Sequence, residues 1–295
     1  MHKVLDNKEL MLTILAHLDL EDLCRVALVR RSWRKHTDSP EFWSTISLRG
    51  RTLQVAKVVH LLRRHSCVQQ LDARGVRLSP ADLADVLPVL TALRSLELDK
   101  PGYDDRELAA ISDHLPVLTR LVLAGGAVGS PGHMFHHHVH AAGAAAGWPT
   151  LRHPVLECLA LECGRAPRLR LALPRLARLE LRDFNCGSLQ LAEGGALESL
   201  SLADCGKMSD SALRFLLCLE GEASQPRLPR LTTLSLSGVA HVGDETLRSC
   251  GQRHAGLTRL VLAGCPALTG EALARAGGFA SLQELILDAC DCLCG

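Results

Sequence analysis

Five histidines crowd into eight consecutive residues, and imidazole is a common ligand of zinc and other transition metals. On a helix, two pairs of them would lie four residues apart on one face, a spacing that can hold a metal ion. No cysteine or carboxylate accompanies them locally, and the next seven residues are only alanine and glycine. The composition favours a solvated loop, so we predict no metal site here. The histidines are His133, His136, His137, His138 and His140.

The sequence contains 12 cysteines, and its last six residues include a C-x-C-x-C motif. This motif consists of Cys290, Cys292 and Cys294. A structural zinc site needs a fourth ligand and a more characteristic spacing, so plain thiols are the favoured interpretation. Small, buried, hydrophobic side chains are predicted for Cys163, Cys205 and Cys265.

Motifs that indicate catalysis are absent from the sequence. We find no P-loop, no G-x-G-x-x-G, no G-x-S-x-G and no H-E-x-x-H, and no cysteine is paired with a base in a recognisable frame. The 33 basic and 32 acidic residues nearly cancel, which argues against nucleic acid or an acidic membrane surface as a partner. We therefore predict a protein that binds other proteins, with no enzymatic activity and no cofactor.

The first residues do not resemble a signal peptide, and no apolar run reaches the ~18 residues of a membrane span. We therefore expect a soluble intracellular protein, located in the cytoplasm, the nucleus or both. Its cysteines are expected to stay reduced in such a compartment.

A leucine pattern, L-x-x-L-x-L, recurs through most of the chain. Nine copies are present, and the weakest is the first, Val68-Leu71-Ala73. The second leucine falls at positions 71, 96, 121, 159, 179, 200, 234, 260 and 285, so most successive spacings lie between 20 and 26 residues. This is the period of leucine-rich repeats.

The spacing of the leucines predicts how each repeat folds. The two leucines of L-x-L point to the same side of a short strand, into the core, and the residue between them faces the other way. Each repeat buries its leucines only against its neighbours, so the strands stack side by side. We predict a right-handed α/β solenoid, or horseshoe, with a parallel inner sheet and return helices that begin at Ser209, Gly243 and Thr269.

Four repeats depart from the common length. Two have only 20 and 21 residues, which is too short for a strand, two turns and a full helix. Because residues 168–174 and 188–192 alternate apolar and polar side chains, we predict extended or 3₁₀ outer segments there. Two other repeats carry insertions, near 124–155 and 219–229. The chain ends just after the last predicted strand, which leaves open a truncation at the C-terminus.

Residues 1–50 do not follow the leucine repeat. Leu10, Ile14 and Leu18 fall at helical spacing, and Asp19 can cap a second helix that carries further apolar residues. A Ser-Pro pair predicts the start of a third short helix. Three short helices cannot bury all of these apolar groups, so the composition suggests a surface for a partner.

This N-terminal segment resembles the F-box over residues 4–48. Asp6 stands where the family has a proline. Arg30, directly after Val29, also departs from the family pattern. Asp6 or Asn7 can cap the first helix. The residues that match the family pattern are Leu5, Ile14-Leu15, Leu18, Leu20, Leu23-Cys24-Arg25, Val29, Trp33-Arg34 and Phe42-Trp43.

The repeats resemble the cysteine-containing class of leucine-rich repeats that commonly follows an F-box. With its short repeats, the chain is also similar to plant F-box/LRR-repeat proteins such as F-box/LRR-repeat protein 15. The resemblance implies two domains, a three-helix F-box (1–48) and a leucine-rich-repeat domain (49–295).

The same resemblance implies the substrate-recognition subunit of an SCF-type (Skp1–cullin–F-box) ubiquitin ligase. The F-box would bind a Skp1-type adaptor and, through it, the cullin and RING subunits, while the repeats would bind a target protein. An alternative is an interaction scaffold outside any ligase, whose N-terminal leucines only cap the solenoid. The resemblance places these residues at the adaptor interface or in the small core behind it: Leu5, Leu10, Ile14, Leu18, Leu20, Leu23 and Val26.

The inner face of the predicted sheet is where a target would bind. It is lined by the residues between and after the paired leucines, which are charged in the first half and small or apolar in the second. These charges would set the preference for a target, although they could equally serve only to keep the sheet soluble. The candidates are Glu97, Asp99, Glu162, Glu180 and Arg182.

Overall fold

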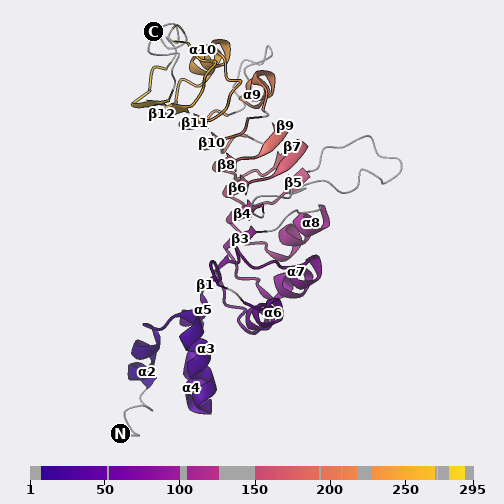
Figure 1. Cartoon of the computed structure of the whole chain (residues 1–295), viewed down its shortest axis with the longest axis vertical. Coiled ribbons are helices and arrows are strands. Elements are labelled where there is room, and N and C mark those ends of the chain that lie inside the picture. Colours follow the sequence, from indigo (N-terminus) through magenta and orange to yellow (C-terminus); the bar gives the residue numbers. More distant parts are fainter. Residues whose placement is uncertain are drawn as a thin grey trace, which may run out of the picture.

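The computed structural model shows an elongated molecule with a helical module at the N-terminal end and a long solenoid after it (Figure 1). The histidine cluster, the C-x-C-x-C motif and Leu5 lie outside the residues that the structure describes. The described residues are 8–51, 53–99, 105–125, 150–192, 194–206, 208–217, 228–269, 271 and 279–289.

The described part of the N-terminal module contains four short helices, where the sequence predicted three. The predicted second helix is interrupted because Arg30 adopts extended backbone angles (φ −147°, ψ 147°) between two helical segments. Asp19 caps the second helix as predicted, and its carboxylate accepts a hydrogen bond from the backbone N–H of Asp22 at 2.9 Å. The helices are α2 (Lys8–Leu15), α3 (Leu20–Val29), α4 (Arg31–Thr37) and α5 (Pro40–Trp43).

Among the described residues, ten parallel strands form one continuous sheet along the solenoid, which confirms the predicted inner sheet. Nine of them carry the leucine pattern, and the tenth, β1, comes from within residues 1–48. Leucine faces leucine across neighbouring strands, as in the pair Leu96 and Leu121. In spatial order the strands are β1 (Thr45–Ser47), β2 (Gln70–Asp72), β3 (Ser95–Asp99), β4 (Arg120–Ala124), β6 (Cys158–Glu162), β8 (Arg178–Arg182), β10 (Ser199–Ala203), β11 (Thr233–Ser237), β12 (Arg259–Ala263) and β13 (Glu284–Asp288).

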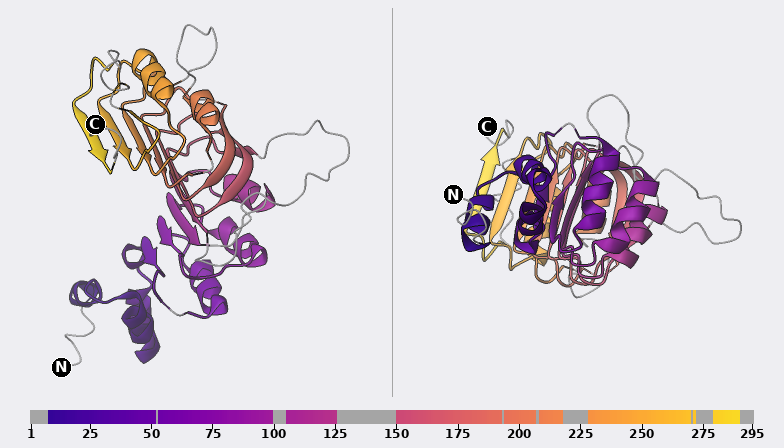
Figure 2. Two further views of the ribbon diagram at one scale, coloured as in Figure 1. Left: turned by 45° about the horizontal axis from the view of Figure 1, so that its top comes forward. Right: turned by 90° about the horizontal axis from the view of Figure 1, so that it is seen from below.

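The layer behind this sheet changes from helices to strands and back to helices (Figures 1 and 2). In the two short repeats it consists of strands β7 and β9, which confirms the predicted extended segments. Strand β5, at the end of the predicted insertion 124–155, completes a three-stranded parallel sheet. The outer elements are α6 (Val55–Arg64), α7 (Pro80–Val86), the 3₁₀ helix η1 (Leu87–Val89), α8 (Asp105–His114), β5 (Thr150–Arg152), β7 (Arg165–Ala172), β9 (Asn185–Leu191), α9 (Asp210–Leu216) and α10 (Asp244–Arg253).

Helices cover both edges of this outer sheet, since α8 contacts β5 and α9 contacts β9. Unpaired strand edges would otherwise expose backbone N–H and C=O groups to other chains. No helix in the described ranges combines the length and the apolar character needed to cross a membrane.

Leucine fills the space between the two layers. The second leucine of the pattern is at most 2% exposed in every repeat from Leu71 to Leu260. Complete burial of a leucine side chain stabilises a fold by roughly 1.5–3 kcal/mol relative to exposure. In the last strand, Leu285 and Leu287 are 41% and 38% exposed, because no described strand lies beyond β13. Burial in each repeat therefore depends on the repeat that follows it.

In the main sheet, the residue directly after each strand from β6 onward has a positive φ angle, between 46° and 63°. Its N–H donates to the last carbonyl of the next strand, as from Asp204 to Ser237 at 2.8 Å and from Gly238 to Ala263 at 2.7 Å. The left-handed conformation turns the chain out of the sheet while adding one hydrogen bond to the ladder. The residues are Cys163, Asp183, Asp204, Gly238, Gly264 and Ala289.

Two of the three cysteines predicted to be buried are buried. Cys205 and Cys265 lie two residues after their strands, and their thiols donate to the carbonyl oxygens of Leu181 at 3.6 Å and Leu236 at 3.2 Å. The prediction was wrong for Cys163, which is exposed. Cys163 follows its strand directly and so occupies the positive-φ position instead of the buried one.

Aspartate at the start of a return helix joins consecutive repeats. The carboxylate of Asp210 accepts a hydrogen bond from the N–H of Gly243 at 3.1 Å, and Asp244 accepts one from the N–H of Thr269 at 2.8 Å. The predicted helix starts at Ser209 and Gly243 are confirmed. The first-turn acid of one helix thus satisfies a backbone donor at the start of the next.

Three buried histidines occupy one position of the repeat, three residues before the first position of the leucine pattern. Nε2 of His153 and Nε2 of His254 lie 3.0 Å from the carbonyl oxygens of Leu115 and Leu217. The third is His65. Burial lowers the pKa of all three imidazoles, so the folded protein favours their neutral form.

Replacing Gly238 by alanine should destabilise the solenoid by about 1–3 kcal/mol, as strained backbone positions do. An added Cβ would lie 2.5 Å from Oδ1 of Asp204, and φ is +63°. Gly256→Ala is the matched control, since nothing lies within 4 Å of its Cβ position. Urea unfolding measures both variants, and equal losses of stability would contradict this explanation.

The free energy of unfolding should decrease as the pH falls below the ordinary imidazole pKa of about 6.5. The unfolded state then binds protons that the folded state, with its lowered histidine pKa values, resists. His254→Leu should make this decrease shallower, because it removes one of the buried imidazoles. Leucine suits this position, since other repeats carry it there, for example Leu90. Urea unfolding at pH 7.5 and pH 5.5 provides the comparison. An unchanged pH dependence in the variant would contradict the assignment.

Candidate functional site

Helix α2 divides its apolar residues between two faces. Met11 and Leu15 are 3% and 1% exposed and pack with Leu23 in a small core of the N-terminal module. Leu10 and Ile14, on the adjoining face, are 38% and 43% exposed. Their spacing of four residues places them side by side on the helix. This pair is an apolar surface on which a partner can dock.

The other described residues predicted for this surface serve the interior. Leu23 is buried in the small core, and Leu18 and Val26 pack against it. Leu20 packs against the core of the solenoid instead. The prediction placed all of these residues either at the adaptor interface or in the core behind it. The structure leaves Leu10 and Ile14 for the interface and assigns the other described residues to the core.

Two exposed apolar residues on α3 were not predicted to belong to this surface. Leu28 is 82% exposed and Val29 is 61% exposed. The signal was available in the helical phase: at 100° per residue, Leu28 lies about 140° around the helix from the buried Leu23. A run of leucine and valine hides this difference unless the buried side is already known.

Trp43 joins the module to the solenoid. Its ring stacks on that of His65 with centroids 3.8 Å apart and an interplanar angle of 11°. Its Nε1–H donates to the carbonyl oxygen of Thr37. Trp43 is 2% exposed and belongs to the solenoid core, while Phe42 packs against both cores. With β1 in the main sheet, these contacts make the module the first cover of the solenoid.

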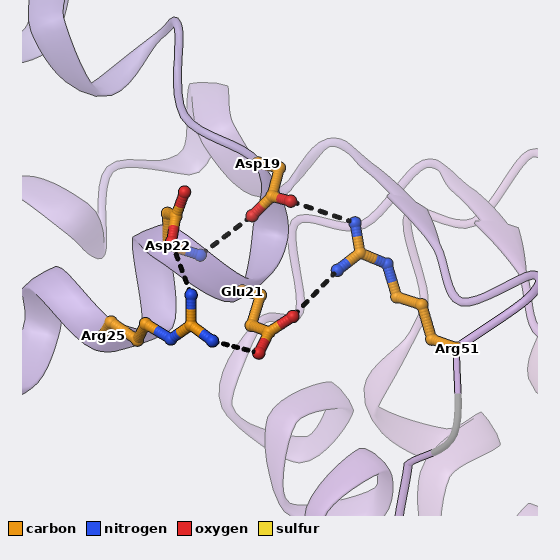
Figure 3. A network of polar contacts seen from close by, with 5 residues as sticks. All are labelled: Asp19, Glu21, Asp22, Arg25 and Arg51. Carbon is orange, nitrogen blue, oxygen red and sulfur yellow. Dashed lines mark hydrogen bonds and ion pairs between the residues drawn. The ribbon is translucent and has the colours of Figure 1, made fainter.

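Ion pairs brace the same junction from outside (Figure 3). Arg51, in the solenoid, reaches Asp19 at 3.6 Å and Glu21 at 3.9 Å at the start of α3. Arg25 binds Glu21 and Asp22 from within α3. These side chains are 30% exposed or more, so solvent screens each pair and its contribution to stability is small. The network orients the module more than it stabilises it.

A charged network occupies the first part of the inner face. Arg74 bridges Asp72 at 2.7 Å and Glu97 at 2.6 Å, and Arg120 lies 3.6 Å from the other oxygen of Glu97. Partial burial opposes ionisation of Asp72, but hydrogen bonds from Arg74 still hold its pKa below the ordinary value. The same hydrogen bonds and carboxylates raise the pKa of Arg74. Glu97 was predicted from its place in the repeat, whereas Arg74, which lies after β2, was not.

The other predicted charges of the inner face lie further along the sheet. Glu180 and Arg182 are exposed, whereas Asp99 and Glu162 are half-buried. The strand register places Glu162 beside Arg182, on β6 and β8. The middle of this face therefore presents both signs of charge side by side.

Some small residues expected to face solvent on the inner face are buried. Val122 and Ala160 are 2% and 7% exposed. They lie in one row between Glu97 and Glu180, whose longer side chains flank them. Beyond them the row continues through half-buried residues of the last four strands, namely Ser201, Ser235, Val261 and Ile286.

In the part of the chain that the structure describes, no three or more His, Cys, Asp or Glu side chains are grouped to hold a metal ion. The five clustered histidines and the C-x-C-x-C motif lie outside the described residues.

The N-terminal module matches the family model of F-box-like domains over residues 8–49. The match takes in all four described helices and β1. The chain therefore combines F-box helices with an α/β solenoid of leucine-rich repeats. No curated protein matches it in sequence. The narrower similarity to plant F-box/LRR-repeat protein 15 finds no support in these comparisons.

Solved structures with a related arrangement include the complex of Rad7 and Elc1 from yeast, with 13% identity and a TM-score of 0.39 over 96% of this chain and 82% of that one. The TLR13–ssRNA13 complex has 16% identity and a TM-score of 0.40, covering 85% of this chain and 34% of that one. An internalin from Listeria monocytogenes has 11% identity and a TM-score of 0.29 over 91% of this chain and 87% of that one. None of these comparisons indicates an enzyme family.

Proposed function

We propose that this protein is the substrate-recognition subunit of an SCF-type ubiquitin ligase. The observation that carries the proposal is the exposed pair Leu10 and Ile14 in an F-box-like domain whose own core is too small to cover it. A Skp1-type adaptor would bury this pair, with Leu28 and Val29 as further contacts, in the manner of a helix in a groove. The adaptor would in turn connect the chain to the cullin and RING subunits.

The inner face of the sheet is the proposed site for the target protein. Glu97 is already paired with Arg74 and Arg120, so its charge is largely satisfied within the protein. Among the described residues, Glu162 and Glu180 form no such ion pair, and Arg182 adds a positive charge next to Glu162 on the neighbouring strand. Together with Asp99, they would select a target by complementary charge.

The proposed role of the chain is positional. A target held on the solenoid would be kept close to the ubiquitin-conjugating enzyme carried by the other subunits, which raises the effective concentration of its lysines. The shared core at Trp43 suits this role, because it limits movement of one binding surface relative to the other. Ubiquitination would then direct the target to the proteasome, in the cytoplasm or the nucleus.

The double variant Leu10→Ala/Ile14→Ala should weaken binding of a purified Skp1-type adaptor by about tenfold or more, since a few apolar anchors dominate such interfaces. Stability should change little, because both side chains are already exposed. Isothermal titration calorimetry measures the affinity. Leu53→Ala is the matched control, because Leu53 is also 38% exposed but lies outside the module helices. If the wild-type protein does not bind the adaptor, the chain is better described as a scaffold outside a ligase.

Charge reversal at Glu162 and Glu180 by lysine should release the target from the inner face, because each change replaces an attraction by a repulsion. Proteins captured from cells with the proteasome inhibited can be quantified for the wild type and the variant. Adaptor capture should remain unchanged. A control variant reverses Asp113 and Glu245, which lie on the outer helices α8 and α10. A target retained by both variants would exclude this surface.

A further inference from the structure

A cleft of about 600 Å³ lies between the N-terminal module and the first outer helix of the solenoid. One side is formed by Arg34 on α4, and the other by one face of α6. The inner face does not use this surface, and of the lining residues Val59 also packs against the leucine core. The α6 residues that line the cleft are Ala56, Val59, His60, Arg63 and Arg64.

Positive charge in the cleft is only partly balanced. Within the described ranges, the guanidinium of Arg34 has no acidic partner. Arg63 lies 3.8 Å from Asp85, but both side chains are more than half exposed, so this pair is weak. The one acid that lines the cleft, Asp82, is engaged by its own helix cap, where it accepts hydrogen bonds from the backbone N–H and hydroxyl of Ser79.

The module and the solenoid are tied together beside this cleft. Arg64 of α6 forms an ion pair with Asp38, the residue that ends α4. Trp43 stacks on His65 directly after α6. The two walls therefore have a defined separation, and Arg34 faces α6 across a preformed space.

The lining residues of α6 form an elongated strip. Ala56, Val59, His60 and Arg63 are spaced by three, four and seven residues, which places them along one face of the helix. The strip is about 10 Å long at 1.5 Å per residue, enough for about three residues of extended chain. Its apolar end offers contact for aliphatic carbon, and its basic end offers charge.

We propose that this cleft binds an acidic segment of another protein in extended conformation. Carboxylates of the segment would pair with Arg34 and Arg63 from opposite walls, and its aliphatic groups would rest on Ala56 and Val59. Ligand-binding clefts have volumes of roughly 300–1,000 Å³, and this cleft lies in that range, with much more room than one phosphate ion needs. The site is separate from Leu10 and Ile14 and does not depend on adaptor binding.

Fluorescence anisotropy of a labelled oligoglutamate peptide with the full-length protein tests the proposal, with oligoglutamine as the uncharged comparison. Arg34→Gln and Arg63→Gln should each weaken oligoglutamate binding by about fivefold, which corresponds to one surface ion pair of ~1 kcal/mol. Lys57→Gln is the matched control, because Lys57 is exposed on the same helix and does not line the cleft. This variant should bind within twofold of the wild type.

Three results would overturn the proposal: no binding of oligoglutamate, equal weakening by Lys57→Gln, or complete displacement by inorganic phosphate at the peptide's own concentration. The first two would reduce the cleft to a solvated basic surface, and the third would make it a phosphate site. Circular dichroism checks that the variants fold. If Arg34→Gln does not fold, Arg63→Gln on the opposite wall decides the question alone.

Discussion

Rows of leucine that pack between the two layers, each repeat against its neighbours, hold this protein together. Because every repeat relies on its neighbours for burial, the first repeat needs something else to cover it. Leu20, Phe42 and Trp43 of the F-box-like domain provide that cover, and β1 extends the sheet into the same domain. The domain proposed to bind the adaptor is therefore part of the folding unit that carries the proposed target surface. Loss of this cover would disturb both surfaces at once.

The sequence predicts those parts of the fold that repeat. L-x-x-L-x-L specifies a strand, the side that it buries and its place beside the next strand, so the sheet, its register and the rows of the inner face were all predicted. The 20- and 21-residue repeats even indicated the strands of the outer layer, because chain length excludes a helix there. Helix caps such as Asp19 and Ser209 were predicted for the same reason: their effect is local.

Features that depend on a single backbone angle or on distant neighbours were not predicted. Cys163 was placed in the core because its type matches Cys205, yet a shift of one position puts it on the left-handed turn. The break at Arg30 and the bridging role of Arg74 leave no pattern in the sequence. In the N-terminal module, composition indicated that there are more leucine side chains than the short helices can bury. Only the packed helices show which leucines remain exposed.

The second sheet behind β6, β8 and β10 has a consequence for the shape of the solenoid. Parallel strands are spaced by about 4.8 Å, whereas packed helices need about 8–10 Å. Where helices back the main sheet, the wider outer layer forces the stack to bend, with the helices on the longer circumference. Where β5, β7 and β9 back it, both layers have the same spacing and the stack can run straight. From this spacing we expect the short repeats to form a straighter segment between two curved ones, so that their number sets how far apart the two ends of the molecule are held.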